Sequence, residues 1–171
     1  MWRLGLVFVD ISLHRRGPDV LPASQFLLGL VLVVYFLVGA ATLPANEAPL
    51  VAFALLVADR VLYLGAAWAA LTAIAKPRRF TQTAIALVGA DVFLNLVSLP
   101  LLLWDDRTHA PLEQVTLPRL LIAIVYLWSI DVGGFIVARA MSRPYIVGLS
   151  VVVVYVLLSL ALRDAILPTV S

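Results

Sequence analysis

The chain has 171 residues, of which 63% are hydrophobic and 13% are charged, whereas soluble domains carry about 25% charged residues. Stretches of about twenty residues contain no charge, so a helix there would have no water-facing side. The net charge of +2 is scattered over short loops, which argues against a nucleic-acid partner. The absence of cysteine excludes disulfides, thiolate metal sites and cysteine nucleophiles.

The N-terminal segment predicts a short helix lying in the membrane interface. Helical spacing places four apolar side chains on one face: Trp2, Leu6, Val9 and Leu13. It places three ionisable side chains on another: Arg3, Asp10 and His14. Asp10 interrupts the apolar run and no small-residue cleavage pattern follows, so the segment is expected to be retained. An unstructured tail is the alternative.

Five apolar stretches predict five transmembrane helices, each long enough to cross about 30 Å of hydrocarbon. The spans run from about Pro22 to Leu43, Leu50 to Ile74, Thr81 to Trp104, Arg119 to Met141 and Tyr145 to Leu162. Ser24 is a candidate cap for the first, which Pro44 and Asn46 end, and Pro100 is expected to kink the third. The sequence therefore predicts an all-α integral membrane bundle, 1–171, that forms a single domain.

Positive charge is divided unevenly between the two predicted sides. One side carries eight cations: Arg3, Arg15, Arg16, Lys76, Arg78, Arg79, Arg139 and Arg143. The other side carries three cations, Arg107, Arg119 and Arg163, among five acids, Glu47, Asp105, Asp106, Glu113 and Asp164. Because short cationic loops stay in the cytoplasm, we expect a cytoplasmic N-terminus and a C-terminus on the opposite side. The compact loops favour a bacterial inner membrane.

Four ionisable side chains fall near the middle of predicted spans: Asp59, Arg60, Asp91 and Asp131. An unpaired Asp or Arg there costs about 2.5–3.5 kcal/mol, so these groups are expected to face inward and pair. Arg60 is expected to pair with Asp91 or Asp131. Asn95 and Ser98 follow Asp91 on the same helix face and form a polar stripe. Three acids against one base leave at least one acid that we expect to be protonated.

The candidate polar cluster consists of Asp59, Arg60, Asp91, Asn95 and Asp131. It acts either as glue between helices or as a proton relay or polar substrate pocket. A water-accessible cavity touching Asp91 would favour the second, and a dry, fully paired cluster the first. Small residues are expected to let helices approach closely: Gly65, Ala69, Ala73, Gly133 and Gly134.

Catalytic and metal-binding motifs are missing from the sequence. It contains no Gly-x-Ser-x-Gly, no His-Glu-x-x-His and no phosphate-binding glycine loop. The two histidines, His14 and His109, fall on opposite predicted sides, so a shared metal site is not expected. We therefore expect no enzyme activity, no cofactor and no metal.

Between Phe80 and Pro100 the chain reads Phe-Thr-Gln-Thr, then Gly89, then Leu-Pro, directly after a basic loop. This segment of about twenty residues resembles the third-helix region of the Yip1-like membrane proteins. The resemblance implies a small five-span, non-enzymatic protein with a cytoplasmic N-terminus, and it supplies no site residues. The Asp-Leu-Tyr-Gly-Pro-type signature of the eukaryotic members is absent, which puts their trafficking role in doubt here.

These observations leave two functional hypotheses. The leading one is a non-catalytic membrane scaffold or adaptor that organises lipid, other membrane proteins or further copies of itself. The alternative is a proton-coupled small-solute transporter or channel component that uses the intramembrane acids.

Overall fold

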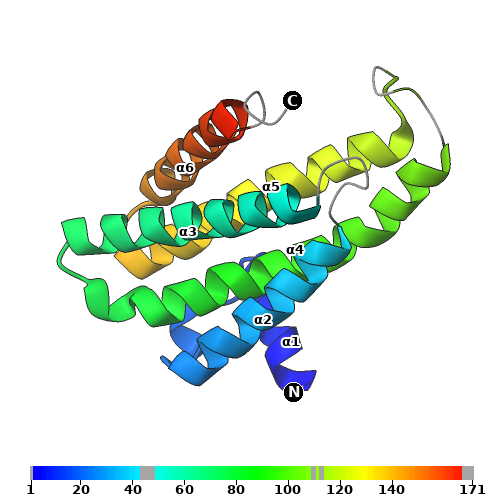
Figure 1. Cartoon of the computed structure of the whole chain (residues 1–171). Helices are drawn as coiled ribbons and strands as arrows, with labels where there is room; N and C mark the ends of the chain where they lie inside the picture. The colour runs from blue at the N-terminus through cyan, green and yellow to red at the C-terminus, as the bar shows by residue number, and fades with distance from the viewer. Residues whose placement is uncertain (1, 43–48, 109–110, 112–113, 167–171) are drawn as a thin grey trace.

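The computed structural model describes residues 2–42, 49–108, 111 and 114–166. These residues form six α-helices and two one-turn 3₁₀ segments (Figure 1). In chain order the elements are α1 (Trp2–Ser12), η1 (Pro18–Val20), α2 (Gln25–Ala41), α3 (Pro49–Ala73), η2 (Pro77–Arg79), α4 (Phe80–Thr108), α5 (Leu117–Met141) and α6 (Tyr145–Ile166). The prediction of an all-α chain is confirmed.

Four helices, α3 to α6, are long and apolar enough to cross a membrane. Most of their surface faces outward, with only 11–39% of each apolar window buried, as lipid-facing helices require. Helix α4 continues through Pro100 to Thr108, beyond its predicted end at Trp104. The structure therefore supports a helical membrane bundle with four candidate spans.

The fifth predicted span is not confirmed. Its helix, α2, begins at Gln25, because Ser24 accepts a hydrogen bond from the Leu27 amide and caps the first turn. The 17 residues of α2 extend about 25 Å at about 1.5 Å per residue, less than the roughly 30 Å of hydrocarbon. The predicted end of this span, Pro44 and Asn46, lies outside the described residues.

Helix α4 is the centre of the bundle (Figure 1). Helices α1, α2 and α5 pack directly on it, α6 packs on α5, and α3 contacts both α4 and α6. Residues 83–90 of α4 are all buried, and alanine and glycine among them let neighbours approach from every side. This arrangement places the polar face of α4 against α3 and α5.

The small residues predicted to allow close helix packing are buried on α5 but exposed on α3. Gly133 and Gly134 are buried, as predicted: a Cβ at Gly133 would clash with the Tyr63 hydroxyl of α3, and a Cβ at Gly134 would lie 3.0 Å from the Leu149 Cα atom of α6. The prediction for α3 is wrong, because Gly65 is exposed with nothing within 4 Å of a Cβ placed there. Ala69 and Ala73 are exposed too, since α3 buries another face, made of Tyr63, Ala67 and Leu71.

Helix α1 docks on the bundle, so the alternative of an unstructured tail is wrong for residues 2–12. Leu6 and Leu13, from the predicted apolar face, are exposed. A second apolar face packs on the core: Leu4, Val7, Phe8 and Ile11. The indole nitrogen of Trp128 donates to the Ser12 carbonyl over 3.0 Å, which fixes the end of α1 on α5. The side chains of Trp2 and Arg3 lie outside the described set.

The contact between Phe8 and Gly89 provides a test of this docking. A Cβ on Gly89 would lie 2.1 Å from the Phe8 ring, so Gly89→Val is expected to displace α1. Overpacking of this kind costs about 1–3 kcal/mol, so hydrogen exchange in α1 should accelerate roughly tenfold to a hundredfold. Gly65→Val, which meets open space, is the control. Unchanged protection of α1 in Gly89→Val would contradict the docking.

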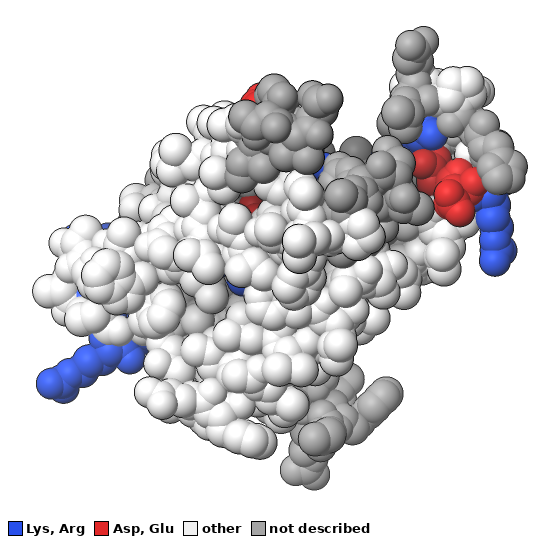
Figure 2. Space-filling model, in the orientation of Figure 1, with Lys and Arg blue, Asp and Glu red and all other residues white. Residues whose placement is uncertain are grey.

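The two ends of the bundle differ in charge. At one end the basic turn between α3 and α4 binds the end of α5: Lys76 donates to the Met141 carbonyl over 2.9 Å, and Arg79 to the Ala140 carbonyl over 3.0 Å. These cations compensate carbonyls at a helix C-terminus. Figure 2 shows cationic side chains projecting from this end, while the visible flank between the two ends is almost uncharged.

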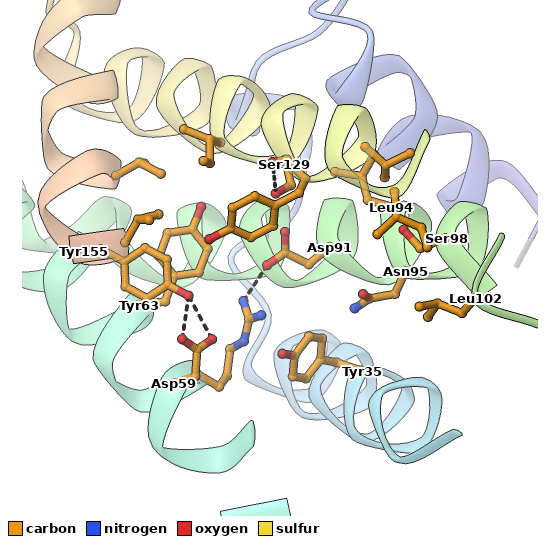
Figure 3. A pocket seen from close by; sticks show the side chains of 17 residues that line it. Tyr35, Asp59, Tyr63, Asp91, Leu94, Asn95, Ser98, Leu102, Ser129 and Tyr155 are labelled. Carbon is orange, nitrogen blue, oxygen red and sulfur yellow. Dashed lines mark hydrogen bonds and ion pairs between the residues drawn. The ribbon is translucent and has the colours of Figure 1, made fainter. Parts of the chain in front are cut away.

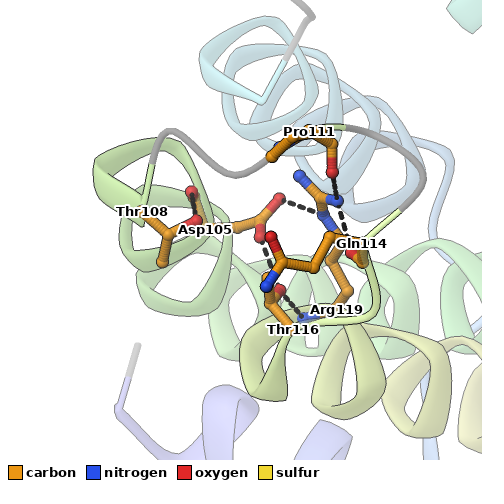
Figure 4. Close-up of polar contacts among 6 residues, drawn as sticks. All are labelled: Asp105, Thr108, Pro111, Gln114, Thr116 and Arg119. Atoms are coloured by element: carbon orange, nitrogen blue, oxygen red, sulfur yellow. Dashed lines mark hydrogen bonds and ion pairs between the residues drawn. The ribbon is translucent and has the colours of Figure 1, made fainter.

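At the opposite end, Asp105 near the end of α4 pairs with Arg119 in the first turn of α5 (Figure 4). Arg119 donates to Asp105 over 3.0 Å and to the Gln114 carbonyl over 2.7 Å. Thr116 donates to the other Asp105 oxygen over 2.9 Å and also caps α5. These bonds satisfy loop carbonyls and hold the ends of α4 and α5 together.

Candidate functional site

A cavity of about 310 Å³ lies among α2, α3, α4, α5 and α6 (Figure 3). Its ionisable lining includes Asp59 and Arg60 from α3 and Asp91 from α4. Along α4 the lining continues from Asp91 through Asn95 and Ser98 to Leu102, and Figure 3 shows these side chains in that order. The cavity therefore extends from the middle of the bundle toward the end that carries Asp105.

An ion pair between α3 and α4 lines the cavity. Arg60 Nη1 lies 2.6 Å from Asp91 Oδ2, and the two side chains are 6% and 17% exposed. The guanidinium group also lies over the Tyr35 ring, 3.9 Å from its centroid, as a cation–π contact. The prediction that Arg60 pairs with Asp91 or Asp131 is thus resolved in favour of Asp91.

The neighbouring acid, Asp59, points to a different helix. Tyr155 donates to both of its carboxylate oxygens over 2.8 Å, and Ser159 donates to one of them. The Tyr155 ring stacks on Tyr63, with 4.3 Å between centroids. Successive side chains on a helix differ by about 100° in direction, so Asp59 reaches α6 while Arg60 reaches α4. Helix α3 is therefore bound by polar contacts to both neighbours.

Asp131 lies apart from the other predicted site residues. It does not line the cavity, and its side chain is 42% exposed. Tyr145 donates to it over 2.6 Å, and the His14 Nε2 atom lies 3.4 Å from its other oxygen. Four members of the candidate polar cluster thus line one cavity, and Asp131 instead connects the N-terminal segment, α5 and α6.

The tyrosines of the site were not predicted from the sequence. Tyr35, Tyr63, Tyr126 and Tyr155 all line the cavity, although deep aromatic residues are usually packing residues. A signal was present, because Tyr155 and Ser159 are one helical turn apart and together present two hydroxyl groups on one face. Two hydroxyl groups on one face of a membrane-spanning helix can both donate to a carboxylate on a neighbouring helix, as Tyr155 and Ser159 do to Asp59.

Several polar groups of the cavity have unused hydrogen-bonding capacity. Within the described residues, the side chains of Asn95 and Ser98 make no hydrogen bond. Arg60 Nε is buried and lacks a partner there too. Such groups are costly in a dry interior, so they are suited to water or a polar solute. No group of three or more potential metal ligands occurs in the described part of the chain.

Comparison with known proteins gave no match. No protein-family description fits the sequence, and neither a curated protein nor a solved structure is significantly similar to it.

Proposed function

We propose that this protein is a proton-coupled carrier, or a component of a channel, that binds a small polar solute in the central cavity. The observation that carries the proposal is the buried Arg60–Asp91 pair, which lines a cavity of about 310 Å³. Ionisable groups within apolar bundles commonly mark ion and solute pathways. Asp91 would be the group that gains and loses the proton.

The proposal places the protein in a lipid bilayer, with α3 to α6 as spans. Helix α2 would be the fifth, with local thinning of the bilayer to match its length. The end carrying Lys76 and Arg79 would lie in the cytoplasm, in keeping with the positive-inside rule. The N-terminus would then be cytoplasmic and the C-terminus outside, in a bacterial inner membrane, and the cavity would extend toward the outer side.

Proton-driven flux in proteoliposomes tests the proposal. Vesicles loaded with a pH-sensitive dye receive an inward pH gradient together with lactate, glycine or ethanolamine, which cover three charge types. The parent protein is expected to acidify the lumen with at least one solute faster than protein-free vesicles do. Asp91→Asn is expected to reduce this rate to the protein-free level, because the amide cannot exchange a proton.

Asp131→Asn is the matched control, since it removes the same charge from a central position that does not line the cavity. It is expected to retain the parent rate. A parent protein that gives no solute-dependent flux, or an Asp131→Asn variant as inactive as Asp91→Asn, would contradict the proposal.

A second candidate function is a non-catalytic scaffold or adaptor, as the resemblance to Yip1-like proteins implies. It is favoured by the pairing of Asp59, Arg60 and Asp91 within the chain, which is sufficient for gluing helices together. If the protein is a scaffold, the parent should give no solute-dependent flux in vesicles. Asp91→Asn should then lower only the stability of the fold. It also predicts reproducible crosslinks to a membrane partner or to a second copy.

A further inference from the structure

We infer that the solute is a small carboxylate with an aliphatic body, which binds Arg60 in exchange for Asp91. The inference rests on the proposed function and names its substrate class. It follows from three features of the cavity: the donors that Arg60 leaves unused, the fixed position of Asp59, and the division of the walls into polar and aliphatic parts.

Arg60 uses little of its hydrogen-bonding capacity. A guanidinium group has five N–H donors in a planar fork, which matches a carboxylate best through two parallel bonds. Among the described residues its one bond to a carboxylate runs from Nη1 to Asp91 Oδ2, the Tyr35 side chain is a further polar neighbour, and its Nε is buried without a partner. Its face is covered by the Tyr35 ring, so further acceptors must approach the edge. Arg60 is therefore equipped for a second acceptor group.

The two acids of the cavity are not equivalent. Asp59 is held by Tyr155 and Ser159 on α6, which occupy its oxygens. Among the described residues Asp91 has a single hydrogen-bond partner, Arg60, so it is the carboxylate that a ligand can replace. A cationic ligand on Asp91 would leave Arg60 buried without a counter-charge, which is strongly unfavourable. An anionic ligand that binds Arg60 replaces the counter-charge of Asp91, and Asp91 becomes neutral by taking up a proton, so no buried charge is left unpaired by the exchange.

The exchange conserves charge. The ligand carboxylate brings one negative charge to Arg60, and a proton taken up from the bulk solution neutralises the Asp91 carboxylate, so the net charge of the cavity is unchanged. The other ionisable groups that line the cavity are Asp59 and Tyr63 on α3, Tyr35 on α2, Tyr126 on α5 and Tyr155 on α6. No residue of α1 lines it within the described part of the chain. Tyrosines are ordinarily neutral at pH 7, and both oxygens of Asp59 already accept hydrogen bonds from α6, so Asp91 is the proton acceptor.

The walls indicate the rest of the ligand. Beyond the ion pair the cavity is lined by aliphatic side chains, among them Leu102, Ile122 and Val125, which suit a short hydrocarbon body. Asn95 and Ser98 line the same region along α4 and could bind a hydroxyl or carbonyl group. A volume of about 310 Å³ is at the small end of the roughly 300–1,000 Å³ typical of ligand pockets. Short-chain acids and their hydroxy or keto derivatives fit these conditions.

Equilibrium binding to the purified full chain in nanodiscs tests the inference, with tryptophan fluorescence or calorimetry as the readout. The probes are propionate and lactate, with propionamide as the neutral control and propylammonium as the cationic control. Both acids are expected to bind more tightly at pH 5.5 than at pH 7.5, because binding takes up a proton. The amide and the amine are expected not to bind.

Variants separate the roles of the two charged residues. Asp91→Asn frees Arg60 and should tighten propionate binding at pH 7.5 about tenfold, the effect of one charge-assisted hydrogen bond, while removing the pH dependence. The double variant Arg60→Gln/Asp91→Asn leaves neither member of the ion pair charged and without its partner, so it is expected to fold but not to bind acids. Asp131→Asn should bind as the parent does.

Three results would overturn the inference. These are acid binding that persists in the double variant, propylammonium binding that Asp91→Asn abolishes, and no binding of either acid to the parent. The proposed function is judged separately by solute-dependent proton flux. Flux with ethanolamine but not with lactate would therefore reject the carboxylate and leave the carrier standing.

Discussion

Replacing Arg60 by glutamine is expected to destabilise the folded protein by about 3–5 kcal/mol, because Asp91 then remains buried without its counter-charge. Both side chains are largely inaccessible, at 6% and 17% exposure. The cation–π contact with Tyr35 is lost at the same time. The free energy of unfolding, measured by denaturant titration in mixed micelles, gives the effect directly.

The double variant Arg60→Gln/Asp91→Asn distinguishes the unpaired charge from the loss of arginine itself. Replacing both partners removes the uncompensated charge, so the double variant should recover most of the stability that Arg60→Gln loses. Asp131→Asn alters a side chain that is 42% exposed, and it should cost less than about 1 kcal/mol. A double variant as unstable as Arg60→Gln alone would show that the ion pair does not explain the loss.

Gly148→Val is expected to force α6 away from α5. A Cβ at position 148 would lie 2.2 Å from the Gly134 carbonyl oxygen and 2.4 Å from the Ala138 amide nitrogen. These are backbone atoms, so no change of rotamer relieves the clash and the helices themselves must separate. Overpacking of a helix interface costs about 1–3 kcal/mol, occasionally more. The thermal midpoint in detergent should fall accordingly.

The control for this substitution is Gly29→Val in α2. It makes the same change within a helix, but no atom lies within 4 Å of the added Cβ. The difference between the thermal midpoints of the two variants therefore measures the packing clash apart from the change in helix propensity. Equal midpoints for the two variants would mean that α5 and α6 do not approach as described. Separation of α6 should also draw Tyr155 away from Asp59 and reduce flux.

The site and the fold share one element, helix α3. On α3, Arg60 pairs with Asp91 of α4, and the adjacent Asp59 accepts a hydrogen bond from Tyr155 of α6. Breaking either contact therefore changes how α3 is held. Release of Asp91 from Arg60 by a ligand would leave α3 bound to α6 alone through this polar set. The exchange proposed for the cavity thus provides a physical reason for α3 and α4 to change their relative position.

Sequence alone determined which segments form apolar helices, that a central charge must be paired, and where one helix is capped. Long apolar runs identified the helices that became α3 to α6, because a backbone in lipid must satisfy its own hydrogen bonds. The high cost of an isolated charge predicted that Arg60 would pair with an acid. Ser24 was recognised as a cap, and its side chain does accept from the Leu27 amide over 3.3 Å.

Only the tertiary structure decided which surfaces meet. Helical period assigns Asp91 and Asp131 to faces of their own helices, but it does not say which helix lies opposite. Gly65 shares a helix face with the small residues Ala69 and Ala73, a pattern typical of helix packing, and is nevertheless exposed, whereas Phe8 docks α1 on Gly89. The cavity itself is a gap that several helices fail to fill, so no single stretch of residues encodes it.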